Sequence, residues 1–425
     1  MNKVENTMIS IIGLGYVGLP LAVAFGKKIK TIGFDINAKR IEQLKLGKDV
    51  SNEISKKEIT EAKKLFFTNN LEEVKKCNFH IIAVPTPVDE FKSPDLTPLV
   101  GASNLVAKIL KKEDVVVYES TVYPGATEEV CVPILEKKSG LKFNKDFYVG
   151  YSPERISPAD NSNVCDIVKV TSGSTREAGK YVDDIYKQII TAGTFLVKNL
   201  KIAEACKVIE NTQRDVNIAF MNEISMLLNK MGLDSQEVIS AMKTKWNALS
   251  FVPGLVGGHC IGVDPYYLIY KSQQLGVDTE MMINARLVND SIPFHIANEM
   301  IKSMCEKNIN PNKSKILIMG ASFKENCCDI RNSRTFDIAN EILKYNAQVH
   351  IYDPIVNEKE VMSEYKIKLL SDPKNGEYDG IILAVPHKQF KEMGAEGIKK
   401  FGKKNKAIFF DIKAVFDGKS SDWRL

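Results

Sequence analysis

The chain has 425 residues, of which 44% are hydrophobic and 26% are charged. A chain of this length exceeds what one hydrophobic core supports, so we expect two or three domains. Its net charge of +5, from 58 basic and 53 acidic side chains, is too small for a dedicated nucleic-acid binder.

Signals for a membrane, for secretion and for a metal are missing from the sequence. No apolar run approaches the roughly 20 residues that cross a bilayer, and the first residues contain no apolar signal core. The eight cysteines form no CxxC pair and no metal-like His/Cys cluster, so neither a disulfide framework nor a zinc site is indicated. These features predict a cytoplasmic protein without a membrane partner.

The first motif is a glycine turn between two predicted strands. The apolar run "ISII" leads into Gly13, Gly15 and Gly18, and a second run, "KTIGFD", ends at Asp35. In a dinucleotide-binding unit the first glycine permits the tight turn, the second lets the backbone approach a pyrophosphate, and the third lets the helix pack on the sheet. Asp35 would accept hydrogen bonds from the adenosine ribose and repel a 2′-phosphate, which favours NAD over NADP.

Three more predicted strands follow, and each ends in a loop that can meet a ligand. Residues 79–88 and 114–125 end in loops marked by proline and hydroxyl groups, and residues 146–160 lead into a loop with Glu154. Because ligands bind at the carboxyl edge of a parallel sheet, these loops are candidates for the cofactor and substrate sites.

A long helix is predicted after about residue 200. Residues 201–232 contain no proline and no glycine before Gly232, and their apolar residues recur at helical spacing. Lys207 and Asn211 lie four residues apart and therefore share one face of this helix. A helix of this length usually bridges domains or subunits.

The last part of the chain repeats the first in degenerate form. Residues 313–326 resemble the opening strand and its turn but keep one glycine of the fingerprint, Gly320, while residues 347–354 and 378–390 resemble "KTIGFD" and the 79–88 strand. We therefore expect an α/β protein with two Rossmann-like, doubly wound domains joined by the long helix. One domain would bind a dinucleotide and the other a different nucleotide-bearing ligand.

Basic residues follow the first strand of the repeated half. Lys324, Arg331 and Arg334 lie within one predicted nucleotide-type turn. Each of them alone is more often a surface charge, but the three together favour a diphosphate, because arginine offers paired donors to phosphate oxygens.

The stretch "FVPGLVGGHCIGVDPYY", residues 251–267, contains a thiol in a glycine-rich setting. A single cysteine is more often structural, a small buried hydrophobe, and the other seven are left as structural. Beside an NAD domain, however, the Cys260 thiolate can add to an aldehyde, lose a second hydride as a thiohemiacetal and form a thioester that water hydrolyses. Gly257 and Gly258 would let the backbone lie against a sugar ring.

Three further side chains fit this chemistry. Asp264 could serve as a base or orient water. Lys207 would stabilise the alkoxide and later the oxyanion, and Asn211 would donate a hydrogen bond beside it.

These motifs resemble the UDP-glucose/GDP-mannose dehydrogenase family over nearly the whole chain. The resemblance is carried by "GLGYVGLP", "VPTP", "STVYPG", "SPER", "ACKVIENTQRD", "PGLVGGHCIGVDP" and "FKENCCDIRNS". It implies NAD-dependent oxidation of a nucleotide sugar at C6, twice, to a uronic acid. It also implies three parts: residues 1–199 as the NAD-binding domain, 200–310 as a central helical dimerisation domain, and 311–425 as a Rossmann-like UDP-sugar-binding domain.

The resemblance also assigns roles to individual residues. The implied catalytic residues are Cys260 as nucleophile, Lys207, Asn211 and Asp264 as its partners, Glu154 as the acid in thioester hydrolysis, and Thr121 as a water-positioning residue. The implied cofactor-binding residues are Gly13, Gly15, Tyr16, Val17, Gly18, Asp35, Arg40, Thr86, Thr121 and Arg331. The implied substrate-binding residues are Glu154, Arg155, Lys207, Asn211, Gly257 and Lys324.

Departures from the UDP-glucose enzymes indicate the sugar. Those enzymes typically carry a lysine before the aspartate, where this chain has Val263, and a second glutamate where it has Pro158. The motifs instead resemble the branch that acts on UDP-N-acetylhexosamines for bacterial surface polysaccharides. UDP-N-acetylglucosamine or its galacto epimer is the first choice, UDP-N-acetylmannosamine the next. Cys328 stands where that branch commonly has proline.

Two other classes of protein remain as alternatives. A two-electron dehydrogenase of small hydroxy acids would need neither Cys260 nor the repeated half of the chain. A catalytically silent NAD-sensing or scaffold protein would tolerate loss of the thiol.

Overall fold

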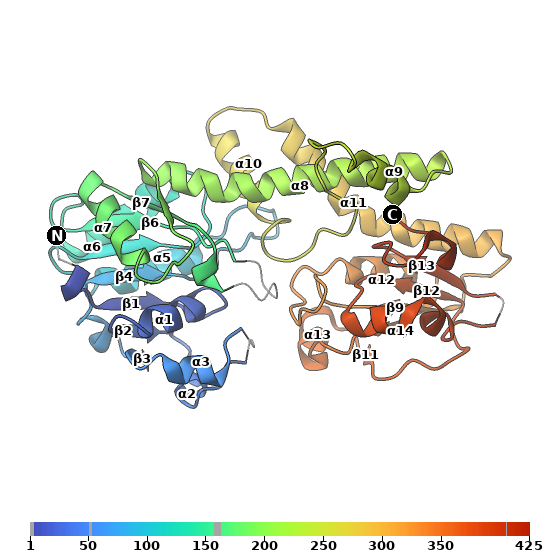
Figure 1. Cartoon of the computed structure of the whole chain (residues 1–425), viewed down its shortest axis with the longest axis horizontal. Coiled ribbons are helices and arrows are strands. Elements are labelled where there is room, and N and C mark those ends of the chain that lie inside the picture. Colours follow the sequence, from blue (N-terminus) through green and yellow to red (C-terminus); the bar gives the residue numbers. More distant parts are fainter. Residues whose placement is uncertain (1–3, 51–52, 157–162, 405) are drawn as a thin grey trace. The chain divides into compact units, whose positions relative to one another are not determined.

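The computed structural model describes residues 4–50, 53–156, 163–404 and 406–425 (Figure 1). These residues form two compact units. The first contains Met1–Glu210 and Tyr266–Asp278, and the second contains Asn211–Pro265 and Thr279–Leu425. Each unit has its own sheet and its own hydrophobic core.

The first unit is built on an eight-stranded sheet with the order β3-β2-β1-β4-β5-β6-β7-β8. Its pairs are parallel except β6–β7. Its strands are β1 (Ile9–Ile12), β2 (Thr31–Phe34), β3 (Leu65–Thr68), β4 (Phe79–Ile82), β5 (Val115–Tyr118), β6 (Tyr148–Tyr151), β7 (Lys169–Gly173) and β8 (Thr194–Leu196). The strand order reverses between β1 and β4, and doubly wound sheets bind dinucleotides at such a point.

The helices of the first unit connect these strands. They are α1 (Gly18–Gly26), α2 (Ala38–Lys45), α3 (Lys56–Glu61), α4 (Leu71–Val74), α5 (Thr97–Ala107), α6 (Val132–Ser139) and α7 (Arg176–Tyr186). Short 3₁₀ turns lie at Val4–Asn6 and Val164–Asp166, and a π-helical turn at Thr127–Cys131 leads into α6.

The second unit contains a five-stranded parallel sheet with the order β11-β10-β9-β12-β13. Its strands are β9 (Lys315–Met319), β10 (Gln348–Tyr352), β11 (Leu369–Leu370), β12 (Gly380–Leu383) and β13 (Ile408–Asp411). Its helices are α9 (Ser235–Met242), α11 (Glu280–Glu306), α12 (Thr335–Leu343), α13 (Glu358–Tyr365) and α14 (Lys388–Lys399), with a 3₁₀ turn at Gly418–Ser420. In chain order this sheet repeats the first five strands of the other, as the internal repeat predicts.

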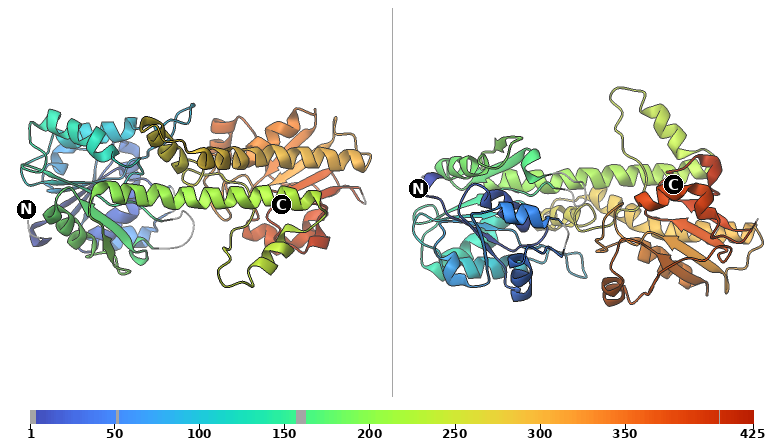
Figure 2. Two further views of the ribbon diagram at one scale, coloured as in Figure 1. Left: turned by 90° about the horizontal axis from the view of Figure 1, so that it is seen from above. Right: turned by 60° about the horizontal axis from the view of Figure 1, so that its bottom comes forward.

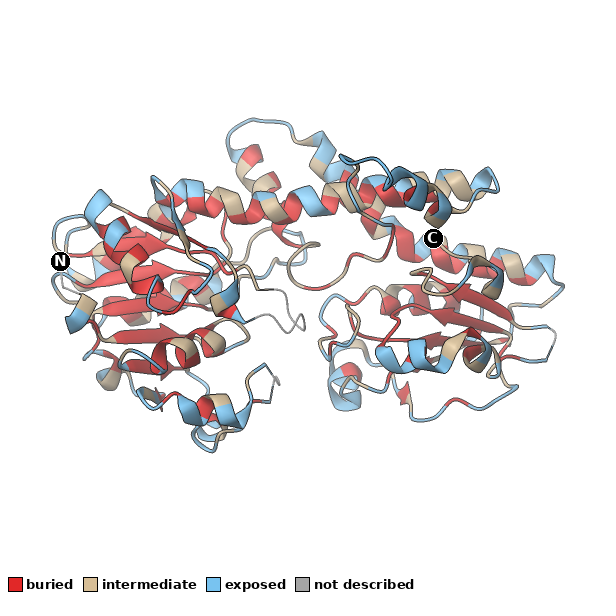
Figure 3. Ribbon diagram, viewed as in Figure 1, coloured by how far each residue is buried: buried red, intermediate tan, exposed pale blue. Residues whose placement is uncertain are grey.

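Most strands of the two sheets are buried on both faces. The strands β1, β2, β4, β5, β7, β12 and β13 are buried at every position (Figure 3). Parallel strands covered by helices on both faces read as continuous apolar runs, which explains why most of them could be located from the sequence.

Two helices, α8 (Leu200–Lys230) and α10 (Asp264–Gln274), contribute residues to both units. Figure 2 shows α8 as one uninterrupted helix, consistent with a stretch free of proline and glycine. The predicted fold class is thus confirmed: an α/β protein with two Rossmann-like domains and a long central helix. In the described part of the chain, no helix is both long and apolar enough to cross a membrane.

Candidate active site

The glycine turn of the first unit leaves room for a ligand at one position only. Gly13 has φ +91°, and a Cβ there would lie 2.9 Å from the carbonyl oxygen of Ala83. A Cβ on Gly18 would lie 1.8 Å from the carbonyl oxygen of Gly13, so α1 packs directly on the turn. A Cβ on Gly15 would meet nothing within 4 Å. The turn is therefore closed by protein at its two ends and open at its centre, where a pyrophosphate would approach.

Asp35 stands at the end of β2 beside this turn. One of its carboxylate oxygens accepts the backbone N–H of Leu14 at 3.0 Å, and the other accepts that of Asn37 at 2.9 Å. The guanidinium of Arg40 donates to the carbonyl oxygen of Leu14 at 3.0 and 3.2 Å and pairs with Asp49 at 2.7 Å. Asp35 and Arg40 thus hold the turn from two sides, and Tyr16 and Val17 are half-buried between the second and third glycines.

The loops after β4 and β5 are tied together at the same edge of the sheet. The hydroxyl of Thr86 donates to the carbonyl oxygen of Thr121 at 2.7 Å, and that of Ser120 donates to the carbonyl oxygen of Val84 at 2.6 Å. The phenol of Tyr267 donates to the carbonyl oxygen of Thr86 at 2.8 Å. The structure therefore brings Thr86 and Thr121 together, as expected if both meet the cofactor.

Glu154 follows β6 and is 7% exposed. One carboxylate oxygen accepts the backbone N–H groups of Arg155 and Ile156, both at 2.6 Å. The other oxygen is buried and accepts no hydrogen bond from the described residues.

Arg155 donates to Glu210 at 2.5 and 3.2 Å and to the carbonyl oxygen of Val168 at 3.0 Å, so internal acceptors bind the guanidinium that was predicted to bind substrate. Pro158 lies outside the described residues.

Lys207 and Asn211 lie one turn apart on α8. The Lys207 side chain is buried, with 8% of the residue exposed, and no described residue gives it a hydrogen bond or an ion pair. Asn211 donates its amide to the carboxylate of Asp264 at 2.6 Å, and Asp264 is buried at the first position of α10. A buried ammonium to which the described residues offer no counterion, beside a buried carboxamide, is suited to an oxyanion supplied by a ligand.

Cys260 lies one turn before Asp264. Its carbonyl oxygen accepts the N–H groups of Val263 at 3.0 Å and of Asp264 at 2.8 Å, and the residue is half-buried. Within the second unit the structure therefore brings together Cys260, Asp264 and Asn211. By contrast, burial raises the pKa of the Cys77 and Cys131 thiols to about 12, which makes them unreactive at neutral pH.

The two glycines before Cys260 have a different neighbour from the one expected. A Cβ on Gly257 would lie 2.6 Å from the carbonyl oxygen of Asn332, and one on Gly258, at φ +80°, would lie 2.7 Å from the ring of Phe323. The bare backbone was predicted to lie against a sugar ring, but these positions are filled by the loop after β9. The glycines seat the thiol loop on that loop.

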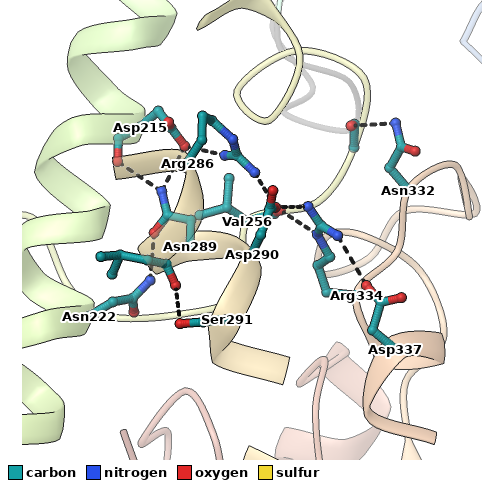
Figure 4. A network of polar contacts seen from close by, with 12 residues as sticks. Asp215, Asn222, Val256, Arg286, Asn289, Asp290, Ser291, Asn332, Arg334 and Asp337 are labelled. Carbon is teal, nitrogen blue, oxygen red and sulfur yellow. Dashed lines mark hydrogen bonds and ion pairs between the residues drawn. The ribbon is translucent and has the colours of Figure 1, made fainter. Parts of the chain in front are cut away.

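A buried polar network fixes the thiol loop along its length (Figure 4). Asn222 on α8 holds both backbone groups of Gly254, donating to its carbonyl oxygen at 3.1 Å and accepting its N–H at 2.7 Å. Arg334 donates to the carbonyl oxygen of Val256 at 3.1 Å, and Asn332 donates to that of Gly258 at 3.1 Å. Three anchors therefore set the backbone that leads to the thiol.

The same network binds a cluster of charges. Arg286 pairs with Asp215 at 2.5 Å and also with Asp290, which in turn pairs with Arg334. Arg334 reaches Asp337 at 3.1 Å as well. Its guanidinium is therefore bound by two carboxylates and a carbonyl, and it holds the loop rather than standing open for a diphosphate.

The other two basic residues of that cluster differ from Arg334. Arg331 is exposed and forms a close pair with Asp329, with Nε at 3.0 and 3.1 Å from the two carboxylate oxygens. Lys324 is half-buried in the loop after β9. Both remain candidates for the cofactor and the substrate respectively.

Sequence reasoning missed Lys413. It follows β13 by two residues at the carboxyl edge of the second sheet, and its ammonium would lie 3.2 Å from a Cβ placed on Gly254. Burial lowers its pKa, opposed in part by Glu325. A cation at this edge of a nucleotide-type sheet fits a phosphate. The signal was present in "IFFDIK", a buried strand followed by a lysine.

The second sheet contains a counterpart of Asp35. Asp353 follows β10 and accepts the N–H of Ala321 at 2.6 Å and that of Ile355 at 2.8 Å. It also pairs at 2.9 Å with the ring of His387, which accepts the N–H of Asn326 on its other nitrogen. Asp353 and His387 are both buried.

Comparison with known proteins places this arrangement in a family. The sequence matches the UDP-glucose/GDP-mannose dehydrogenase family over its NAD binding domain (residues 7–190), its central domain (201–291) and its UDP binding domain (317–418). The chain belongs to this family. The NAD binding domain carries the glycine turn and Asp35, and the open centre of the turn and the two backbone-bound carboxylate oxygens fit NAD as the cofactor.

Individual relatives match over their full length. The chain is 52% identical to the UDP-N-acetyl-D-glucosamine 6-dehydrogenase of Pseudomonas aeruginosa, with 99% of this chain and 100% of that protein covered. It is 52% identical to the enzyme of the same name from Salmonella typhi, with both chains covered completely. The solved structure of the UDP-D-ManNAc dehydrogenase from Pyrococcus horikoshii has a TM-score of 0.85 at 30% identity and covers 97% of this chain and 96% of that one.

Proposed function

We propose that the chain oxidises the C6 hydroxymethyl group of a UDP-N-acetylhexosamine, UDP-N-acetylglucosamine or its galacto epimer, to the uronic acid in two NAD-dependent steps. The full-length relatives at 52% identity are named for this reaction on UDP-N-acetyl-D-glucosamine. The observation that carries the proposal is the Cys260 thiol placed one helical turn before a buried Asp264, which Asn211 holds at 2.6 Å.

Each residue of the proposed site has its own role in the reaction. Lys207 provides a buried positive charge for the C6 oxygen when it becomes an alkoxide, and Asn211 has a second amide N–H to donate to the same oxygen. Asp264 accepts a proton or orients a water, because its carboxylate is buried next to the thiol turn. NAD, when bound, accepts the hydride from C6 in each of the two oxidations.

Cys260 separates the two oxidations. Its sulfur forms a bond to C6 of the aldehyde and gives a thiohemiacetal, and loss of the second hydride gives a thioester. Water then attacks the thioester carbon, the carbon–sulfur bond breaks, and the thiolate returns as the carboxylate leaves. We assign Glu154 to this last step from the family resemblance; its second carboxylate oxygen is buried and accepts no hydrogen bond from described residues.

The UDP group is assigned to the second sheet. Lys324 and Lys413 are the cations at its carboxyl edge that we expect to face the diphosphate, whereas Arg334 holds the thiol loop. The segment that matches the family's UDP binding domain contains all three residues.

Other parts of the proposal concern assembly, location and boundaries. We expect a homodimer formed through the central helix, whose apolar side chains Ile209, Phe220 and Leu227 are each more than half exposed in the single chain. The three-domain division at residues 199 and 310, a cytoplasmic location and a product destined for a surface polysaccharide follow the family resemblance.

The experiment is a panel of UDP-sugars scored for NADH and for product mass. We expect two NADH per UDP-N-acetylglucosamine or UDP-N-acetylgalactosamine, and a product in which one oxygen replaces two hydrogens. Two NADH from UDP-N-acetylmannosamine or UDP-glucose alone would reassign the sugar. One NADH per substrate, or turnover of small hydroxy acids, would overturn the four-electron reaction.

A further inference from the structure

A set of buried ionisable side chains lies behind Glu154 in the first unit and has no part in the steps assigned above. Lys169 opens β7 and is 3% exposed, Glu119 follows β5 and is 1% exposed, and Tyr186 ends α7 with no exposure. A lysine inside a fully buried strand is costly unless carboxylates compensate its charge.

The ammonium group of Lys169 faces two carboxyl groups. Lys169 Nζ lies 2.6 Å from an oxygen of Glu119 and 3.6 Å from the second oxygen of Glu154, the oxygen that accepts no hydrogen bond from described residues. The Tyr186 hydroxyl donates to the other oxygen of Glu119, and the ammonium lies 5.5 Å from the centre of the tyrosine ring. Among the described residues, the neighbouring charge on Arg155 is paired with Glu210 of α8.

The charges of this set do not balance when both carboxyl groups are ionised. Two carboxylates and one ammonium leave one negative charge in a dry environment, and a single proton on either carboxyl group removes it. Burial raises the pKa of Glu119 to about 7, although Lys169 opposes the shift. Burial alone would lower the pKa of Lys169, but Glu119 and Glu154 raise it above its ordinary value, so the ammonium stays charged.

We propose that Lys169 and Glu119 are positioning residues for thioester hydrolysis, which hold the Glu154 carboxylate where it can take a proton from the attacking water. Lys169 faces both carboxyl groups, so Glu119 and Glu154 share the same ammonium. The water oxygen bonds to the thioester carbon, its proton passes to Glu154, and the Cys260 thiolate leaves. This inference rests on the proposed function, since it concerns the second half of that reaction.

The two residues are expected to act in opposite directions. Lys169→Met removes the cation that faces the second oxygen of Glu154. We expect the acid limb of the hydrolysis rate, the pH range in which the rate falls on acidification, to move up by about one to two pH units. Glu119→Gln removes the competing carboxylate and leaves Lys169 to Glu154 alone, so the acid limb moves down. A role limited to folding would not give shifts of opposite sign.

The assay uses the full chain with NAD and the UDP-N-acetylhexosamine that it oxidises. Rapid mixing measures the NADH formed before hydrolysis, and intact-protein mass spectrometry of quenched samples measures the fraction of chains with an acyl group on Cys260. The decay of this adduct is then followed against pH. We expect Lys169→Met to retain the NADH burst and accumulate adduct at neutral pH, and Lys169→Arg to restore the profile toward that of the wild type.

Two further variants make the test decisive. Thr171→Val removes a buried hydrogen bond of 2.7 Å to Asp183 between the same strand and helix, and it should leave the pH profile unchanged. If Lys169→Met does not fold, the double variant Glu119→Gln/Lys169→Met takes its place, because it removes one charge of each sign. The acid limb of its hydrolysis rate should lie at higher pH than that of Glu119→Gln alone. Shifts of the same sign, or none, with an intact NADH burst would overturn the inference. No NADH burst from the wild type with any UDP-hexosamine would instead count against the proposed function.

Discussion

Replacing Lys207 by methionine is expected to stabilise the protein without ligands and, at the same time, to remove its turnover. The ammonium of Lys207 is buried, with 8% of the residue exposed, and no described residue pairs with it. Burying an ion destabilises the folded state by several kcal/mol when no opposite charge or hydrogen bond compensates it. Because part of the side chain still meets solvent, we assign about 1 to 2 kcal/mol to this cost. Methionine keeps the apolar part of the side chain but carries no charge. The free energy of unfolding of the unit that contains Lys207 should therefore rise by that amount.

Both effects can be measured on one preparation. For a unit of this size, a gain of about 1 to 2 kcal/mol raises the melting temperature by about 2 to 8 °C. Loss of the charge that meets the alkoxide and the oxyanion should lower kcat by about 100- to 1,000-fold. Calorimetry without NAD or substrate gives the first value, and NADH formation gives the second. Lys201→Met, an exposed lysine on the same helix, is the matched control and should change stability by less than about 0.5 kcal/mol.

The result that would refute the reasoning is a loss of stability in Lys207→Met. It would mean that the ammonium has a stabilising partner in the free protein, and a charge already satisfied in this way is a poor receptor for an oxyanion. Unchanged turnover would equally remove Lys207 from the active site.

Three further predictions concern the thiol and the two sheet-edge aspartates. Cys260→Ser should abolish uronic acid formation and leave the NAD dissociation constant unchanged by calorimetric titration; equal acid production by the variant would refute the thioester. Asp35→Ala should weaken NAD binding about 10- to 100-fold, as expected for the loss of hydrogen bonds to a charged acceptor, with little effect on UDP-sugar affinity; the reverse pattern would contradict the assignment of the two domains. Asp353→Asn should destabilise the protein by about 1 to 3 kcal/mol at neutral pH. Burial alone would raise the pKa of Asp353, but its hydrogen bond with His387 holds this pKa below its ordinary value of 3.8. The difference in the free energy of unfolding between the wild type and Asp353→Asn should therefore be constant above pH 3.8. It should shrink as the pH falls through the lowered pKa of Asp353 in the wild type, as measured by urea unfolding.

The sequence located most strands of the two sheets, although β7 and β13, which are buried at every position, were not singled out. β1, β2, β4, β5, β6, β9, β10 and β12 all fall inside the apolar runs singled out from the sequence, and α8 ends two residues before the predicted stop at Gly232. Continuous apolar runs identify such strands because no face alternates with solvent. β7 was missed because it opens with Lys169, whose compensating partner Glu119 lies 50 residues earlier in the chain.

The site residues show where local reasoning ends. The proposed grouping of the thiol with Asp264, and of Lys207 with Asn211, follows from helical and turn spacing, which relates residues close in sequence. Arg334 was interpreted as a phosphate ligand because its neighbours are basic, but its carboxylate partner Asp290 lies 44 residues away on α11. A choice between a ligand and an internal counterion depends on such long-range contacts, which sequence spacing does not contain.

The repeated half shows how a duplicated fold loses one ligand while it keeps its geometry. Gly320, at φ +94°, matches Gly13 at +91°, and each glycine donates its N–H at 2.9 Å to the last residue of the neighbouring strand. Asp353 then occupies the place of Asp35, and "AVPH" replaces "AVPT", so His387 stands where Thr86 does.

That single replacement changes what the sheet edge can bind. In the first unit, protein N–H groups take one position on each oxygen of Asp35, which leaves acceptor capacity for ribose hydroxyls. In the second unit, His387 donates to the oxygen of Asp353 that already accepts the N–H of Ala321. The carboxylate is then buried inside its own loop instead of facing a ribose. The turn also lacks the second glycine, and Ser322 fills that place, so we expect the cations Lys324 and Lys413 to hold the nucleotide at the second sheet.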